Sequence, residues 1–380
     1  MLPLQNTESS SHEQGSHSRS SGKKNRKTSR KHGRSVTDKD GTVSKRLRMD
    51  VNVTSNEDSV FPSDLQDEPR QDLSNEEIKF AKSVVGREGT PAFNQFLDFL
   101  ITGEGTKYLE VLKRKGINLS NMSSILGRAG SNAPKAFKEL YDLWFDEQEN
   151  KTPYLKTLEK EGINLSNISS ILGRAGSNAP KAFKELYDLW FDKQGNKTPY
   201  LKTLKDNGVG LARMSSILNG ARSNAPKAFK ELYDLWFDKQ GNKTPYLKTL
   251  EREGINLSNM SSILNGAGAK ASEAFKELYD LWFDKQGNKT QYLKTLKDNG
   301  VGLARMSNIL NGVGSNAPKA FKELYDLWFD KQGNKTQLLN TLEKEGINLA
   351  KMSNILSRAG SNAPKAFKEL YDLWFDKQGN

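Results

Sequence analysis

The sequence predicts an all-α protein, an α-solenoid built from six to seven helical repeats of about 46 residues. The phenylalanine of an Ala-Phe pair recurs every 46 residues without insertion or deletion, at Phe137, Phe183, Phe229, Phe275, Phe321 and Phe367. Each of the six tryptophans of the chain follows one of these phenylalanines by seven residues. A fixed period of this length is typical of stacked, near-identical helical units, each of which contacts its neighbours.

One unit, covering residues 163–198, predicts the helices in order. Apolar residues at helical spacing place the first helix over residues 165–172, and a short loop with two glycines ends it. The second helix is expected to begin at Ser177 or Asn178, whose side chain would cap it. It is expected to run to about Asp192, where a polar stretch breaks the chain.

Threonine, proline and glycine mark the two ends of a third helix. Thr198 precedes Pro199, and proline suits the first turn of a helix because the N–H that it lacks has no partner there. Gly208 fits the position after the last helical turn, where a left-handed backbone is needed. None of the three helices could bury its apolar stripe alone, whereas stacked units can.

The periodicity divides the chain into three parts. Residues 1–72 have almost no aromatic residues and are rich in Ser, Lys, Arg, Asp and Asn, so we expect a disordered arm. Residues 73–118 resemble a divergent copy of the unit and are expected to form a degenerate N-terminal capping repeat. Residues 119–380 hold the tandem repeats, of which the last lacks its third helix.

The arm carries two basic clusters, which favour nuclear import by an import receptor or a nucleic-acid-binding tail. A merely solvated charged tail is the alternative. The clusters consist of Lys23, Lys24, Arg26, Lys27, Arg30, Lys31, Arg34, Lys45, Arg46 and Arg48.

Composition excludes several classes of function. Cysteine is absent, and the three histidines lie within residues 12–32, so we expect no metal site, no cofactor and no enzyme. No run of 18 apolar residues occurs, so we expect no membrane span. The first ten residues lack the pattern of a Sec signal peptide, which leaves export by a specialised bacterial secretion system open.

Charge favours a polyanionic partner. Residues 76–380 hold 45 Lys and Arg against 35 Asp and Glu. At the start of each second helix, a serine, free backbone N–H groups and a lysine resemble a phosphate site. An ordinary capped helix with solvated lysines is the alternative. The expected phosphate-binding residues are Ser131, Lys135, Ser177, Lys181, Ser223, Lys227, Lys270, Ser315, Lys319, Ser361 and Lys365.

The loop between the first and second helices varies while the framework is nearly constant, which is the layout of a modular reader with one subsite per unit. Drift at a solvent-exposed turn is the alternative. Residues 162–177, GINLSNISSILGRAGS, resemble the start of the repeats of transcription activator-like (TAL) effectors, especially their divergent bacterial relatives. The resemblance covers about residues 76–380 and is specific over some 16 residues per unit.

The resemblance implies a right-handed superhelix around double-stranded DNA, with two loop residues per unit at the bases. These pairs would be Arg128 and Ala129, Arg174 and Ala175, Gly220 and Ala221, Gly266 and Ala267, Gly312 and Val313, and Arg358 and Ala359. It further implies a secreted bacterial effector, expected to be a monomer, that acts on transcription in the host nucleus. The units here depart from the family in their greater length, their third helix and the position of their proline.

Two other functions remain open on the sequence. Helical solenoids also serve as scaffolds for proteins, here a host nuclear protein, and under that hypothesis the loops are drift. Reading of single-stranded RNA by helical repeats is the second alternative. Phe183, Tyr187 and Trp190 could be stacking platforms for bases. However, Phe183 and Trp190 lie on one apolar stripe and are expected in the core, which leaves only Tyr187 open.

Overall fold

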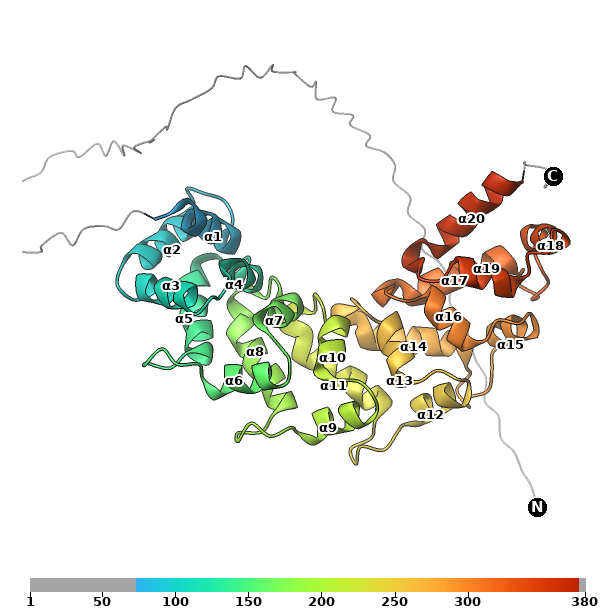
Figure 1. The fold of residues 1–380 in the computed structure, drawn as a ribbon, viewed down its shortest axis with the longest axis horizontal. Coiled ribbons are helices and arrows are strands. Elements are labelled where there is room, and N and C mark those ends of the chain that lie inside the picture. Colours follow the sequence, from blue (N-terminus) through green and yellow to red (C-terminus); the bar gives the residue numbers. More distant parts are fainter. Residues whose placement is uncertain (1–72, 376–380) are drawn as a thin grey trace, which may run out of the picture. The chain divides into compact units, whose positions relative to one another are not determined.

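The computed structural model describes residues 73–375, which are all-α and consist of helical units that repeat every 46 residues. The capping unit comprises α1 (Asn75–Val85), α2 (Pro91–Ile101) and α3 (Glu104–Arg114). Consecutive units lie next to one another in the order of the sequence (Figure 1). The arm at residues 1–72, with the ten basic residues of its two clusters, lies outside the described residues.

Six units, numbered one to six from α4, follow the capping unit and share one plan: a first helix, a 3-10 turn, a second helix and, in units one to five, a third helix. The first helices are α4 (Leu119–Leu126), α7 (Leu165–Leu172), α10 (Leu211–Ile217), α13 (Leu257–Ile263), α16 (Leu303–Ile309) and α19 (Leu349–Ile355). The second helices are α5 (Ala133–Trp144), α8 (Ala179–Trp190), α11 (Ala225–Trp236), α14 (Ala271–Trp282), α17 (Ala317–Trp328) and α20 (Ala363–Trp374). The third helices are α6 (Pro153–Lys160), α9 (Pro199–Asp206), α12 (Pro245–Arg252), α15 (Gln291–Asp298) and α18 (Gln337–Lys344).

The ends of the second helix differ from the sequence prediction. In unit two a 3-10 turn, η2 (Gly176–Asn178), precedes α8, and the Asn178 side chain makes no capping hydrogen bond. The helix ends at Trp190 rather than near Asp192, because Phe191 is extended and forms a β-bridge with Lys197. The first helix is confirmed at Leu165–Leu172.

The third helix is confirmed, and its capping threonine also joins two helices. Thr198 is the N-cap of α9, but its hydroxyl donates to the carbonyl oxygen of Leu189 at 2.6 Å. This bond ties the start of the third helix to the end of the second. Gly208 has φ of +78°, and the N–H of the next residue, Val209, donates to the carbonyl of Leu204, as a helix-ending glycine motif requires.

A carboxylate organises the hairpin that links the second and third helices. In unit two the Asp192 side chain accepts hydrogen bonds from the backbone N–H groups of Gln194 and Asn196, at 3.0 and 2.8 Å. These bonds, with the Asn196 N–H as the largest contribution, hold the pKa of Asp192 below its usual value. The pKa values of the equivalent residues are lowered in the same way: Asp238, Asp284 and Asp330.

The hairpin carboxylates predict acid sensitivity. Because the pKa of each is depressed in the folded state, its contribution to stability is present above the unfolded pKa of about 4 and is lost as the pH falls through the folded pKa. Replacing the four aspartates with asparagine should therefore lower the melting temperature at pH 7 but not at pH 2, where the aspartates are protonated too. Circular dichroism melts at both pH values measure this; an equal deficit at both would contradict it.

The core runs through the interfaces between units. First helices pack on first helices of the next unit, and second helices on second helices. Trp190 of unit two meets Phe229 of unit three edge to face, with ring centroids 6.1 Å apart, and both side chains are fully buried. The same pair recurs at each later interface, so every unit completes the core of the next. Phe183, Tyr187 and Trp190 are all buried, so none of the three is an exposed stacking platform for bases.

Candidate nucleic-acid interface

The variable loops form a ladder in which each loop is bonded to the preceding unit. In unit two the N–H of Arg174 donates to the carbonyl of Ser124 at 2.6 Å, and in unit three the N–H of Gly220 donates to that of Ser170 at 2.8 Å. The same bond recurs in every unit, with Arg128, Gly266, Gly312 and Arg358 as donors. Each 3-10 turn also contacts the second helix of the preceding unit. The loops therefore stand in a fixed row, one per unit.

Each loop has two residues with a left-handed backbone, separated by one residue. The first left-handed site holds Arg128, Arg174, Gly220, Gly266, Gly312 or Arg358, and the second holds Gly130, Gly176, Arg222, Gly268, Gly314 or Gly360. Glycine adopts this conformation freely, whereas a residue with a side chain costs on the order of 1 kcal/mol there. Four arginines nevertheless occupy these sites, with φ between +60° and +73°.

The residue between the two sites points into the stack. Ala129, Ala175, Ala221, Ala267 and Val313 are each at most 8% exposed, and Ala359 is half-buried. The resemblance to TAL effector repeats implies that these residues, the second members of the variable pairs, face the bases. In this structure they fill the space between consecutive turns, so a partner can reach the first members but not these side chains. The four arginines are exposed.

A row of exposed lysines accompanies the loops. Lys181 lies in the first turn of α8 with its side chain 78% exposed, and its amino group is 3.8 Å from Glu185, a loose pair of little strength at such exposure. The lysine recurs in five of the six units, as Lys135, Lys181, Lys227, Lys319 and Lys365. Unit four has the exposed Glu273 at this position and the exposed Lys270 three residues earlier.

The helix start next to this row offers fewer free donors than the sequence suggested. In unit two the N–H of Asn178 donates to Ala175, and that of Ala179 to Gly176, within the 3-10 turn. Pro180 has no N–H. The expected cradle of backbone N–H groups is therefore largely used inside the protein, and the binding capacity rests on the lysines and the serine hydroxyls. The serines Ser131, Ser177, Ser223 and Ser361 are exposed, and Ser315 is half-buried.

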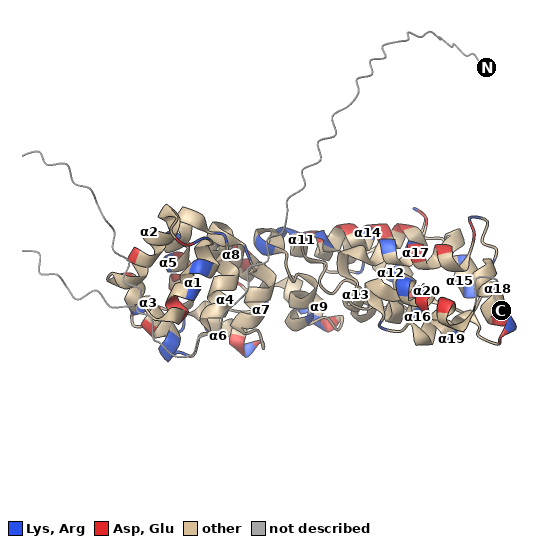
Figure 2. Cartoon of the chain, turned by 90° about the horizontal axis from the view of Figure 1, so that it is seen from above, with Lys and Arg blue, Asp and Glu red and all other residues tan. Residues whose placement is uncertain are grey.

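No family model and no curated protein matches the chain. The row of loops and lysines, which we call the loop edge, combines one variable loop per unit with an exposed lysine at the start of the second helix in five of the six units. Acidic and basic residues occur together on helices such as α11, α14 and α17 (Figure 2). The loop edge is thus distinguished by the position of its cations rather than by a large positive field.

No helix within residues 73–375 is both long and apolar enough to cross a lipid bilayer. No group of three or more His, Cys, Asp or Glu side chains in this range is arranged to hold a metal ion.

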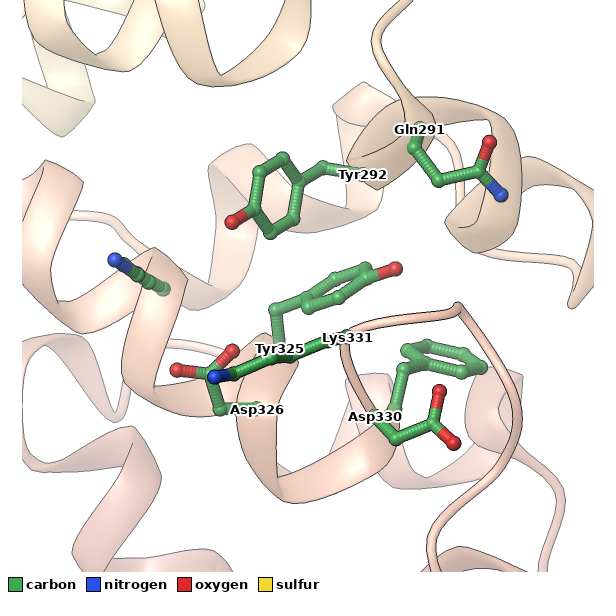
Figure 3. Close-up of a pocket in the computed structure, with 8 residues that line it drawn as sticks. Gln291, Tyr292, Tyr325, Asp326, Asp330 and Lys331 are labelled. Atoms are coloured by element: carbon green, nitrogen blue, oxygen red, sulfur yellow. The ribbon is translucent and has the colours of Figure 1, made fainter.

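A second repeated surface lies at the other end of the second helices. Between α15 and α17, Tyr292 and Tyr325 border a cavity of about 680 Å³, with ring centroids 4.6 Å apart (Figure 3). Asp326, Asp330 and Lys331 complete its rim together with Lys322. Burial raises the pKa of Tyr325, which keeps its hydroxyl protonated.

This tyrosine groove recurs along the array. An equivalent cavity of about 770 Å³ lies beside Tyr200 and Tyr233, and one of about 550 Å³ beside Tyr108 and Tyr141. Sequence reasoning missed it because its tyrosines come from two different units. A signal was present: a tyrosine follows the threonine of the third helix in four units, Tyr154, Tyr200, Tyr246 and Tyr292.

Proposed function

We propose that the chain is a DNA-binding repeat protein that binds double-stranded DNA along its loop edge. Each unit contacts one successive position, or step, along the duplex. The observation that carries the proposal is the fixed row of loops beside an equally periodic row of exposed lysines. DNA is itself a periodic polyanion, so a periodic row of cations is complementary to it. The resemblance of residues 162–177 to TAL effector repeats supports the same function.

The row of lysines and the row of loops have different roles in the proposed binding. Lysines on the second helices are placed to contact phosphates, which fixes the register of the protein without reading sequence. The loops carry the side chains that differ from unit to unit. Unit four has Glu273 where the other five units have the lysine, but it also has Lys270 three residues earlier. The row of cations is therefore maintained in the unit whose framework differs.

Neutralising four lysines of the row tests the proposal. The full-length variant with Lys181, Lys227, Lys319 and Lys365 changed to glutamine should bind all DNA sequences more weakly. Each lost phosphate contact reduces the slope of log affinity against log salt by about 0.9, so the slope should fall by about 3 to 4. Fluorescence anisotropy with a random-sequence duplex at several salt concentrations measures both quantities.

The chain supplies a control with the same change of charge. Lys193, Lys239, Lys285 and Lys331 are exposed in the hairpins at the opposite end of the second helices. Their replacement with glutamine should leave the slope nearly unchanged, because they lie away from the loop edge. If both variants lose affinity equally, attraction is by net charge alone and the loop edge is not the interface.

A second candidate function, a scaffold for a protein partner, is favoured by the tyrosine groove. The cavity at Tyr292 has two acidic and two basic side chains at its rim, so it does not select a polyanion. A repeated groove with aromatic walls instead suits an extended peptide, whose side chains enter successive cavities. Wild-type protein that shows no salt-dependent DNA binding would make this the leading function.

The basic clusters of residues 1–72 support action in a nucleus, and the TAL effector resemblance supports delivery there as a secreted bacterial effector that alters host transcription. The clusters include Lys23, Lys24, Lys45 and Arg46. A nucleus offers the duplex DNA that the loop edge is proposed to bind. This part of the proposal rests on sequence alone.

A further inference from the structure

The two left-handed sites of the loops hold only glycine or arginine in all six units. Arginine occupies the first site in units one, two and six, as Arg128, Arg174 and Arg358. In unit three it occupies the second site instead, as Arg222, and the first site is glycine. Units four and five have glycine at both sites. No unit has two arginines.

Some units leave little room for a side chain at the second left-handed site. In units four and five a Cβ atom at the second site would lie 2.9 Å from a backbone carbonyl oxygen of the preceding loop, that of Asn219 or Asn265. At Gly176 of unit two the nearest backbone oxygen, that of Arg128, would be 3.3 Å away, and at Gly130 of unit one nothing lies within 4 Å. Glycine is thus favoured at the second site both by the sign of φ and by the close approach of the neighbouring loop. Arginine occupies this site in unit three although its φ is +60°.

Within residues 73–375, no hydrogen-bond or ion-pair partner accounts for these four arginine side chains. The arginine side chains that make hydrogen bonds or ion pairs within residues 73–375 are others, namely Arg114, Arg213, Arg252 and Arg305. All four arginines at the left-handed sites are exposed. A strained, exposed and unpartnered residue is expected where a ligand is bound.

The pattern among units distinguishes base contact from phosphate contact. A phosphate contact is needed equally in every unit, and the lysine row has that uniform character. The arginines occur in four units and are absent from two, which is what a sequence-reading group requires. The planar guanidinium donates two parallel hydrogen bonds to O6 and N7 of guanine in the major groove, a pattern that no other base offers.

We propose that Arg128, Arg174, Arg222 and Arg358 are specificity-determining residues that each select guanine, and that units four and five select no guanine. The proposal rests on the proposed binding of double-stranded DNA and adds the base preference. It assigns a reader to unit three, where the variable pair Gly220 and Ala221 had suggested none. The target then contains guanine at the steps of units one, two, three and six.

The test is a selection of bound duplexes from a random double-stranded library, using the full-length wild type and two variants. The wild type should enrich a motif with guanine at three consecutive steps, those of units one to three, followed by two steps without a guanine preference and then by a guanine at the step of unit six. Arg222→Gly should remove the guanine preference of one step only. The expected loss at that step is roughly 5- to 150-fold in discrimination.

Gly266→Arg provides the matching gain of function. A Cβ atom at Gly266 would meet nothing within 4 Å, and Arg128, Arg174 and Arg358 already occupy the same site in other units, so arginine can enter the first left-handed site of unit four. This variant should acquire a guanine preference at one new step. Thermal melts distinguish a loss of stability from a loss of base selectivity. Arg222→Gly relieves backbone strain, so this variant should melt at the same temperature as the wild type or higher.

Each other outcome has a distinct meaning. Arg222→Gly that weakens binding equally on all sequences would make Arg222 a phosphate contact and overturn the inference. Wild-type binding that is salt-dependent but enriches no motif would overturn the inference and leave the proposed DNA binding intact. Wild type that binds no duplex at low salt would overturn both.

Discussion

Replacing Trp236 with alanine is expected to lower the free energy of unfolding by about 3–5 kcal/mol, the range for deleting a large buried aromatic side chain. Trp236 is fully buried at the interface between units three and four, and its ring meets Phe275 edge to face with centroids 6.2 Å apart. The cavity left by the missing indole lies in the middle of the array of units, so the substitution should also weaken the coupling between units one to three and units four to six. Urea denaturation followed by circular dichroism should show a lower midpoint and a broader or divided transition.

Two variants test whether packing at the interface is the cause. Trp374 is the same residue of unit six, but it is 42% exposed, so Trp374→Ala should cost clearly less than Trp236→Ala. Trp236→Phe leaves a smaller cavity and removes an indole N–H that has no hydrogen-bond partner in the structure, so its cost should be about 1–2 kcal/mol. Equal losses for Trp236→Ala and Trp374→Ala would show that stacking of units is not the source of stability.

Replacing Gly268 with alanine is expected to cost about 2–3 kcal/mol, although it adds one methyl group. Gly268 has φ of +61°, which strains any residue with a Cβ atom by on the order of 1 kcal/mol. Its Cβ would also lie 2.9 Å from the carbonyl oxygen of Asn219, so the loops of units three and four would have to separate. Urea denaturation gives the loss.

Gly130 is a control that differs in one respect. It occupies the same site of unit one with the same φ of +61°, but a Cβ there meets nothing within 4 Å. Gly130→Ala should therefore cost only the strain of the backbone, about 1 kcal/mol. The difference between the two variants measures the contact between consecutive loops, and a difference near zero would mean that the loops are not tightly stacked.

Local sequence signals were sufficient for the repeat and for most helix ends. The 46-residue spacing of phenylalanine and tryptophan predicted the units, and the first helix at residues 165–172 and the third helix after Thr198 follow from their apolar stripes and caps. The hairpin after Trp190 was missed, because it depends on backbone N–H groups that bind the Asp192 carboxylate, which no periodicity reveals.

The candidate site was predicted in position but not in detail. The variable loop and the lysine row are where the sequence put them, with the lysines exposed. Which loop residue faces outward depends on backbone angles, so the burial of Ala175 and the left-handed conformation of Arg222 required the structure. A hint was present for the buried member: across six units it is only Ala or Val, as expected for a residue in a tight core.

The identity of the interfaces has a consequence for how such a protein changes over generations. Each boundary is closed by the same Trp–Phe contact and the same backbone bond from loop to preceding helix. A stretch of gene encoding 46 residues can therefore be duplicated or deleted by recombination between its near-identical copies, and the new neighbours still fit. The number of units and the identity of the loop residues can then vary independently. A change in the number of units lengthens or shortens the array, whereas a loop substitution changes the side chain that one unit exposes.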